Sequence, residues 1–231
     1  MNTGHRSITF DVDDDVLALG LTVACFVMEG VDNRESLPEF ELYQEQVVKT
    51  VLRDLSSENI KGDPLLRGFR LLHERAGCAN RKTIAASENL LKHLLKTGCF
   101  LRVNLLVDIY NLVSLSSRLS LGAHDVKRLG GNVRLKMTTG QEGFWPIGSQ
   151  EPDSVRLGEY AYIDDDDDII CRLEVRQVEK TKVTLDTREC FYIVQGNPAA
   201  SSDYLKAVTE DLIELTRRFC GGKERILYKP W

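Results

Sequence analysis

The spacing of apolar residues changes part-way along the chain, and this change constrains the fold more than any other feature. Between residues 39 and 98 apolar side chains recur every three or four positions, as in amphipathic helices. Beyond residue 130, short runs rich in β-forming residues alternate with turn residues instead. Helices first and strands later predict an α+β fold, and 231 residues are enough to bury a sizeable core.

The first hundred residues predict one buried strand and three helices. Residues 17–31 are rich in Val, Leu and Phe, which predicts a buried strand with a bend at Gly20. Pro64 suits the first turn of a helix, Ser87 suits an N-cap, and Gly98 suits a helix end. We therefore expect helices over residues 39–55, 65–75 and 88–97.

The second half predicts strands followed by a closing helix. We expect a hairpin within residues 132–148 that turns at Gly140, another strand within residues 182–196, and a helix over 202–219. Two further β-rich arms flank the five consecutive aspartates 164–168. Because consecutive strand residues point in different directions, we interpret this run as a solvated hairpin tip rather than a metal site.

Composition and cysteine spacing exclude several classes of protein. The six cysteines include no CxxC pair, and no His lies at metal spacing from them, so we expect neither a zinc site nor a disulfide framework. No apolar run approaches the roughly 20 residues of a membrane span, and the first residues lack the layout of a signal peptide. We expect a cytoplasmic protein without a membrane partner, a metal or another cofactor.

The net charge of −5 is unevenly distributed. Between Lys61 and Arg102 there are nine Lys or Arg against three Asp or Glu, a local balance of +6. Such asymmetry is compatible with an anion-binding face, and equally with the solvated outer faces of helices. We expect the segment to bind RNA rather than DNA, through Arg67, Arg70, Arg81, Lys82, Lys92 and Lys96.

An ordered series of short segments carries the functional information, since the sequence lacks a P-loop and the GxGxxG, GxSxG and HExxH patterns. The series comprises Asn104, VDIYN (107–111), LSLGAHD (119–125), GGNVRLKMTTGQEGF (130–144), GEYAYID (158–164), CR (171–172) and TKVTLDT (181–187). It resembles the B3-B4 domain of the phenylalanyl-tRNA synthetase beta subunit. Residues 65–95 also resemble the helical lead-in of free-standing B3-B4 proteins.

The resemblance implies a three-layer β/β/α fold with two parts. Residues 1–100 are expected to form an N-terminal strand and a helical lead-in packed on the same core, and residues 101–231 the B3-B4-like domain. In the synthetase this domain hydrolyses tyrosine wrongly esterified to the phenylalanine tRNA. A free-standing copy is therefore expected to deacylate a mischarged aminoacyl-tRNA in trans, with the aminoacylated 3′ end of tRNA as its partner.

Two other functions stay open at this point. The first is a non-catalytic module that binds tRNA or a free amino acid. The second is a small-molecule hydrolase without an RNA partner, which the overall acidity favours. Deacylation separates the first of these from the trans-acting hydrolase, and the salt dependence of tRNA binding separates the second.

The resemblance also implies the residues of the site. Asn111 matches the editing-site Asn and is expected to orient water together with Thr187. His124 is the candidate general base, since it is the titratable group with a pKa near neutrality in this series. The residues expected to contact the substrate are Asp108, Gly122, Asp125, Arg134, Glu142, Cys171, Arg172 and Thr184.

Each of these residues also has a structural interpretation. Asn111 can be a buried amide satisfied by the backbone, and the aspartates can be caps or braces. Arg134 and Glu142 can pair across a hairpin, and the threonines can simply favour a strand. Gly122 stands where the synthetase has a His, which is a departure from the family pattern.

Overall fold

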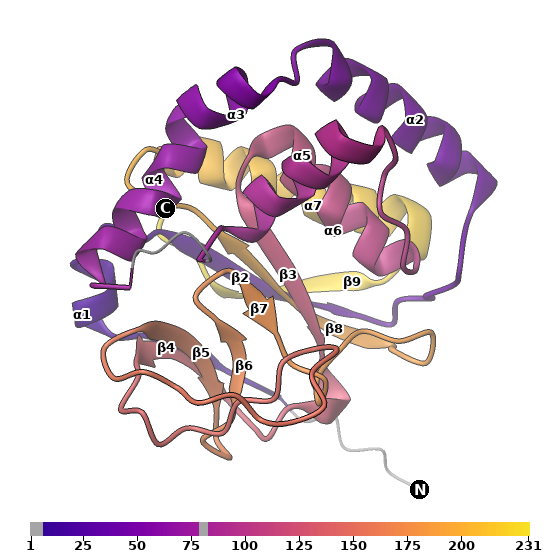
Figure 1. The fold of residues 1–231 in the computed structure, drawn as a ribbon. Helices are drawn as coiled ribbons and strands as arrows, with labels where there is room; N and C mark the ends of the chain where they lie inside the picture. Colours follow the sequence, from indigo (N-terminus) through magenta and orange to yellow (C-terminus); the bar gives the residue numbers. More distant parts are fainter. Residues whose placement is uncertain (1–6, 79–82) are drawn as a thin grey trace, which may run out of the picture.

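The computed structural model describes residues 7–78 and 83–231, which form two β-sheets and a layer of helices (Figure 1). One sheet has four antiparallel strands in the order β3-β8-β2-β9. Its strands are β2 (Val23–Glu29), β3 (Ser120–Asp125), β8 (Glu189–Gln195) and β9 (Lys223–Tyr228). An early strand, β2, therefore lies between the last two strands of the chain.

The second sheet has five strands in the order β1-β4-β5-β6-β7. The strands are β1 (Phe10–Val12), β4 (Val133–Met137), β5 (Tyr160–Asp164), β6 (Ile169–Arg172) and β7 (Arg176–Gln177). β1 pairs with β4 in parallel, and the other neighbours are antiparallel. This sheet packs against one face of the four-stranded sheet, as Figure 1 shows.

Helices cover the opposite face of the four-stranded sheet (Figure 1). They are α2 (Pro38–Arg53), α3 (Ser57–Gly62), α4 (Pro64–Arg75), α5 (Ala86–Thr97), α6 (Leu105–Ser117) and α7 (Ser202–Cys220), with short α1 (Asp14–Leu17) at the sheet edge and a 3-10 turn at Val126–Arg128. None of the helices in the described part of the chain is long and apolar enough to cross a membrane.

Alternation along the central strand β2 creates two separate hydrophobic cores. Phe26 points toward the helices and stacks on Tyr192, with ring centroids 5.0 Å apart. Val27 points the other way, into the core between the sheets, which also holds Phe191 and Tyr162. Because strand residues alternate between faces, one apolar strand can serve both cores. The three layers confirm the predicted α+β, β/β/α fold.

The predicted helices agree with the structure, and two local predictions need correction. Ser87 is not the N-cap of α5, because Ala85 holds that position and the Ser87 hydroxyl bonds to Ser120 3.2 Å away. The predicted strand over 17–31 begins only at Val23, because the chain turns at Gly20, where φ is +84°.

The predicted hairpin within residues 132–148 is wrong. The strand β4 pairs instead with β5, and the pairing extends to Thr138, whose amide donates to the Glu159 carbonyl at 2.7 Å. The intervening loop returns along a different segment, since the Ile147 amide donates to the Gln177 carbonyl at 3.0 Å. Pairing between distant segments thus outweighs the local turn signal at Gly140.

The aspartate run forms the tip of the β5–β6 hairpin, as predicted. The side chain of a lysine from the same chain lies among its carboxylates. Asp164, Asp166 and Asp168 offer oxygens within 4.8 Å of one another. The Lys180 ammonium lies among them, 3.3, 2.9 and 2.7 Å from the three carboxylates respectively. These carboxylates raise the pKa of Lys180 despite its partial burial, so the ammonium remains charged and offsets their mutual repulsion.

Helix α4 contacts the end of β8 through a glycine. A Cβ at Gly68 would lie 2.0 Å from Oδ1 of Asn197, so a side chain there is incompatible with this packing. Asn197 is fully buried; its side-chain amide donates to the Leu65 carbonyl at 2.8 Å, and its Oδ1 accepts from the Ala199 amide at 3.0 Å. The close approach thus fixes α4 on the four-stranded sheet.

Candidate ligand-binding site

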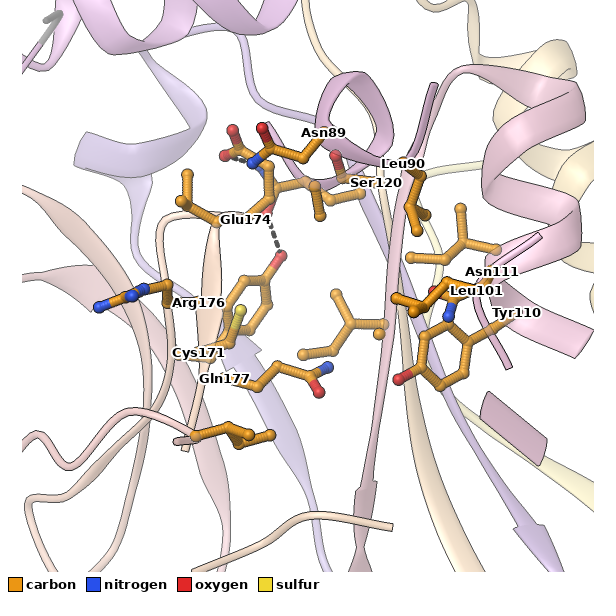
Figure 2. Close-up of a pocket in the computed structure, with 18 of the residues that line it drawn as sticks. Asn89, Leu90, Leu101, Tyr110, Asn111, Ser120, Cys171, Glu174, Arg176 and Gln177 are labelled. Atoms are coloured by element: carbon orange, nitrogen blue, oxygen red, sulfur yellow. Dashed lines mark hydrogen bonds between the residues drawn. The ribbon is translucent and has the colours of Figure 1, made fainter. Parts of the chain in front are cut away.

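A cavity of about 460 Å³ lies where the two sheets and the helical layer meet. Helices α5 and α6 and strands β3 and β8 form one side, and β5, β6, β7 and the β6–β7 turn form the other. Figure 2 shows Tyr110, Asn111, Leu90 and Leu101 on one wall, opposite Cys171, Glu174, Arg176 and Gln177. The volume is in the range of small-molecule sites, roughly 300–1,000 Å³.

The α6 wall presents polar groups without intramolecular partners. Asn104 caps this helix by accepting from the Val107 amide at 3.2 Å, which fixes where the helix begins. Tyr110 and Asn111 lie in the second turn and line the cavity. Among the described residues, neither the Tyr110 hydroxyl nor the Asn111 amide has a hydrogen-bond partner. A buried amide ordinarily needs partners, so a ligand or water is expected to supply them.

The opposite wall comes close to β3 at Gly122. A Cβ there would lie 2.4 Å from Nε2 of Gln177, so the absence of a side chain lets the Gln177 amide approach the strand. Cys171 lines the same wall. Burial raises the pKa of its thiol, which keeps it protonated and unsuited to act as a nucleophile.

A buried hydrogen-bond network runs along one side of the cavity. Glu174 Oε1 lies 2.6 Å from Nε2 of His73, and Oε2 accepts from the Tyr160 hydroxyl at 2.5 Å and from the Gln195 amide at 3.0 Å. The side-chain Oε1 of Gln195 in turn accepts from the Tyr162 hydroxyl at 2.7 Å. Glu174, Gln195 and Tyr162 line the cavity, so the network holds polar groups in place at its surface.

The charge of His73 depends on this network. Burial lowers the pKa of His73, but the adjacent Glu174 carboxylate outweighs burial and leaves the pKa above its ordinary value. His73 is almost completely buried and belongs to α4, so the network connects α4 to both sheets. A charge-assisted bond of this kind is stronger than one between neutral groups.

Three of the predicted site residues line the cavity, namely Asn111, Gly122 and Cys171. The structure places the others elsewhere. Asp108 lies one helical turn before Asn111 and braces the start of α6, accepting from the Val103 amide and from Arg102, both at 2.8 Å. This is the bracing role that was considered for it.

Thr187 and Asp125 bond to each other away from the cavity. The Thr187 hydroxyl donates to Asp125 at 2.8 Å and accepts from the Thr184 amide at 3.0 Å. Asp125 also accepts from the Lys127 amide at 3.0 Å and so caps the 3-10 turn. Both Asp125 and Thr187 are buried, and this arrangement gives them a structural role at the end of β3.

His124 is fully buried beneath the cavity on the same strand face as Gly122. Its Nδ1 lies 2.8 Å from the Thr181 hydroxyl, and within the described residues its Nε2 has no partner. Burial lowers the pKa of His124 to about 3, so the ring is neutral at physiological pH. It does not line the cavity, so it cannot serve there as the general base in this arrangement.

Arg134 and Arg172 form ion pairs with carboxylates outside the cavity. Arg134 faces Asp11 and Asp13 at 3.7 and 3.8 Å on the outer edge of the five-stranded sheet. Arg172 donates to Glu159 at 2.7 Å and lies over the Phe144 ring. The proposed pairing of Arg134 with a glutamate across a hairpin is therefore wrong.

The Glu142 carboxylate accepts hydrogen bonds from residues of its own loop. Its oxygens accept from the Thr139 amide at 2.6 Å, the Thr139 hydroxyl at 2.8 Å and the Gly140 amide at 3.0 Å. Burial alone raises the pKa of Glu142, but these hydrogen bonds outweigh it and hold the pKa below the ordinary value of 4.5. The carboxylate is the form that the loop stabilises.

We expect Glu142→Gln to reduce the free energy of unfolding by about 1–2 kcal/mol at pH 7, because the charge-assisted bonds weaken. The contribution is present above pH 4.5 and is lost as pH falls through the lowered pKa of the folded state, so the two proteins should converge in acid. Urea unfolding across pH 3–7, with exposed Glu151→Gln as the control, measures this. A difference that persists unchanged in acid would contradict the role of the carboxylate.

Four of the predicted RNA-binding cations belong to α4 and α5, and two of these four share one carboxylate. Arg70 and Lys92 lie 2.9 and 2.7 Å from the buried Glu88. Arg67 and Lys96 are exposed. The remaining two, Arg81 and Lys82, lie outside the described residues.

Sequence reasoning missed Glu174, Gln177 and Gln195. Glu174 and Gln177 lie two and five positions after Arg172, so the CR segment is close in sequence to the cavity wall that they form. The Arg172 side chain itself bonds to Glu159 instead. Gln195 follows five consecutive apolar residues at the end of β8, and a buried amide at such a position is a usable signal. Glu174 carried no comparable signal, because acidic residues are common in turns.

Comparison with models of known protein families identifies the family of this domain. The B3/4 domain model matches residues 76–220. The chain belongs to the B3/4 domain family. The matched region contains α5, α6 and all of the cavity-lining residues of this B3/4 protein.

The wider comparisons add little about the family. No curated protein matches this B3/4 chain. Among solved structures it is similar to an N-terminal fragment of the phenylalanyl-tRNA synthetase beta-subunit from Pyrococcus horikoshii, with a TM-score of 0.46 and 16% sequence identity. The similarity covers 95% of this chain and 51% of the other, so this chain spans about half of that fragment.

Proposed function

We propose that this protein is a stand-alone hydrolase that deacylates a mischarged aminoacyl-tRNA. The observation that carries the proposal is the cavity within the B3/4 domain, where the Asn111 amide is available to a ligand. An amide both donates and accepts hydrogen bonds, which suits an ester carbonyl, a ribose hydroxyl or an attacking water. The size of the cavity is compatible with an aminoacyl group and part of the terminal ribose.

The proposed reaction makes modest demands on the protein. An aminoacyl ester is activated, so the site needs to place a water near the carbonyl and to stabilise the negative charge that develops on its oxygen. The Asn111 side-chain N–H donates to that oxygen, and one such donor is worth about 3–4 kcal/mol in well-preorganised sites. The ribose hydroxyl next to the ester accepts a hydrogen bond from the attacking water and relays its proton to the ribose oxygen that leaves as the ester C–O bond breaks, so the step needs no protein base inside the cavity, where His124 is absent.

Cations beside the cavity are proposed to contact the tRNA backbone. Arg176 lines the cavity, and the exposed Lys96 lies on α5, which forms part of the same cavity. Phosphate contacts of this kind release counterions, so tRNA binding should weaken steeply as salt increases. A small-molecule hydrolase without an RNA partner would not show this dependence.

The test is deacylation of a panel of correctly and wrongly charged aminoacyl-tRNAs. We expect selective release of one amino acid, and a loss of about 100-fold or more with Asn111→Ala, because a transition-state donor is removed. The matched control is Gln46→Ala, which removes an exposed amide on α2 away from the cavity. Undiminished release by Asn111→Ala would refute the role of this amide.

A non-catalytic binding module is the second candidate, and the position of His124 favours it. The titratable residue expected to act as general base is buried outside the cavity. If no aminoacyl-tRNA is deacylated while tRNA still binds at low salt, this second function replaces the first.

A further inference from the structure

We propose that Glu174 determines specificity by binding a primary ammonium group of the ligand. The inference rests on the proposed function, because an aminoacyl ester carries such a group next to its carbonyl. Glu174 lies on the wall of the cavity opposite Asn111 (Figure 2). A ligand that spans the cavity therefore meets a carboxylate at one end and a neutral amide at the other.

The Glu174 carboxylate retains capacity for one more donor. A carboxylate has about four acceptor sites, two on each oxygen. Oε2 accepts from Tyr160 and Gln195, whereas Oε1 has one partner, Nε2 of His73. The remaining site on Oε1 is available to a ligand, since Glu174 lines the cavity.

His73 is the one cationic partner described for Glu174. Its side chain is 3% exposed, and a buried carboxylate ordinarily has a charged partner. Among the described residues, no Lys or Arg forms an ion pair with Glu174. Arg176, on the same wall, pairs with Asp153 at 3.5 Å, and its side chain is largely exposed. His73 offsets the charge only when it is protonated.

Glu174 is also held rigidly, as a recognition group needs to be. Its main-chain carbonyl accepts from the Ala86 amide at 3.2 Å, at the start of α5. Its side chain bonds to three buried residues on α4, β5 and β8. Preorganisation by several elements reduces the entropy that a ligand would otherwise have to offset.

The inferred ligand class is an ester or amide derivative that bears a free primary amine. The ammonium donates to Glu174, and the ester carbonyl, which lies beside an α-amine or farther along the ligand from a side-chain amine, meets the Asn111 amide. An N-acylated derivative of the same size has lost the charge and presents a bulkier, neutral group to a buried carboxylate. The amine can be the α-amine of an aminoacyl group or the side-chain amine of lysine, which the experiment separates.

The primary test measures binding of amino-acid methyl esters and their N-acetylated counterparts to the full-length protein by calorimetry. We expect the free amines to bind about 10- to 100-fold more tightly than the acetylated forms, as for a hydrogen bond to a charged group. Lysine methyl ester acetylated on Nα or on Nε tells which amine Glu174 binds. If the unmodified protein binds free and acetylated esters with equal affinity, the proposal is overturned.

Two variants then assign the preference to Glu174. Glu174→Gln keeps the shape and one acceptor oxygen but removes the charge, so the preference should fall to within a few-fold. Glu179→Gln is the matched control, since Glu179 is exposed, pairs with Lys182 and does not line the cavity. A preference that survives in Glu174→Gln would also overturn the proposal.

The affinity for the free amines, measured as a function of pH, distinguishes recognition by Glu174 from a purely structural role. The His73 side chain hydrogen-bonds to Glu174 and to the Thr83 backbone, and it feels the more distant Glu88, which is paired with Arg70 and Lys92. Protonated His73 competes with the ligand ammonium for the same carboxylate. Affinity for the ammonium form of the ligand, corrected for the fraction of amine that has lost its own proton, should therefore rise with pH as His73 loses its proton, and His73→Gln should flatten this rise.

Failure of this proposal and failure of the proposed function are distinguishable. Preference for free amines without deacylation of any aminoacyl-tRNA leaves the Glu174 assignment standing and removes the hydrolase. Deacylation that acts equally on aminoacyl-tRNA and N-acetyl-aminoacyl-tRNA does the reverse.

Discussion

His124→Phe should abolish a large part of the stability loss that the protein suffers in acid. Burial lowers the pKa of His124 to about 3, whereas the ordinary value is 6.5. Below pH 6.5 the unfolded chain binds a proton that the folded protein refuses, so stability falls as pH decreases toward 3. Each pH unit in this window is worth about 1.4 kcal/mol, which gives about 2–3 kcal/mol between pH 6.5 and 4.5.

The measurement is the free energy of unfolding in urea at several pH values from 7.5 to 4.5. At pH 7.5 the variant is expected to be about 1–2 kcal/mol less stable, because the Thr181 hydroxyl loses its partner. Toward pH 4.5 the order should reverse. His93→Gln, which removes an exposed histidine, should leave the slope as in the unmodified protein. Parallel pH profiles for His124→Phe and the unmodified protein would refute the buried neutral imidazole.

Gly68→Ala should lower the free energy of unfolding by about 2–4 kcal/mol. The new methyl group would lie 2.0 Å from Oδ1 of Asn197, which is fully buried and cannot move outward. Overpacking costs about 1–3 kcal/mol, and displacement of Asn197 weakens its bonds to Leu65 and Ala199, at about 1 kcal/mol each.

Gly62→Ala is the matched control for this substitution. Gly62 also lies in a helix, but a Cβ there has no described neighbour within 4 Å. Alanine favours helix by up to about 1 kcal/mol over glycine, so this variant should be unchanged or slightly more stable. Thermal unfolding of the two variants side by side separates packing from propensity, and equal effects would contradict the close contact with Asn197.

Local patterns predicted α2, α4, α5 and α7 but not α1, α3 or α6, and they succeeded where the features that begin and end a helix are close in sequence. Pro64 begins α4, and Gly98 ends α5 with φ of +69°. The strand partners were harder to predict, since β4 pairs with β5 across a loop of more than twenty residues rather than with the segment after Gly140. Turn residues indicate where a chain can bend but not which strand it then joins.

The candidate site illustrates the same limit. Asn111, Gly122 and Cys171 were correctly placed together, because the order of motifs contains information about three-dimensional proximity. His124 was expected beside them, but it lies two residues beyond Gly122 on the same face of β3, outside the lining of the cavity, where burial suppresses its charge. Glu174 escaped notice because its partners His73 and Gln195 are 101 and 21 positions away.

The position of β2 between β8 and β9 has a consequence for synthesis on the ribosome. Glu29 pairs with Arg225, which lies 196 positions later, so the edge of the central sheet cannot close until residues 223–228 have emerged from the exit tunnel. Until β8 emerges the apolar β2 lacks both of its neighbours, and until β9 emerges it lacks one, so it is a template for wrong strand pairing. Sequence-distant pairing of this kind slows folding. The nascent chain is therefore expected to depend on chaperones that shield its first apolar strand.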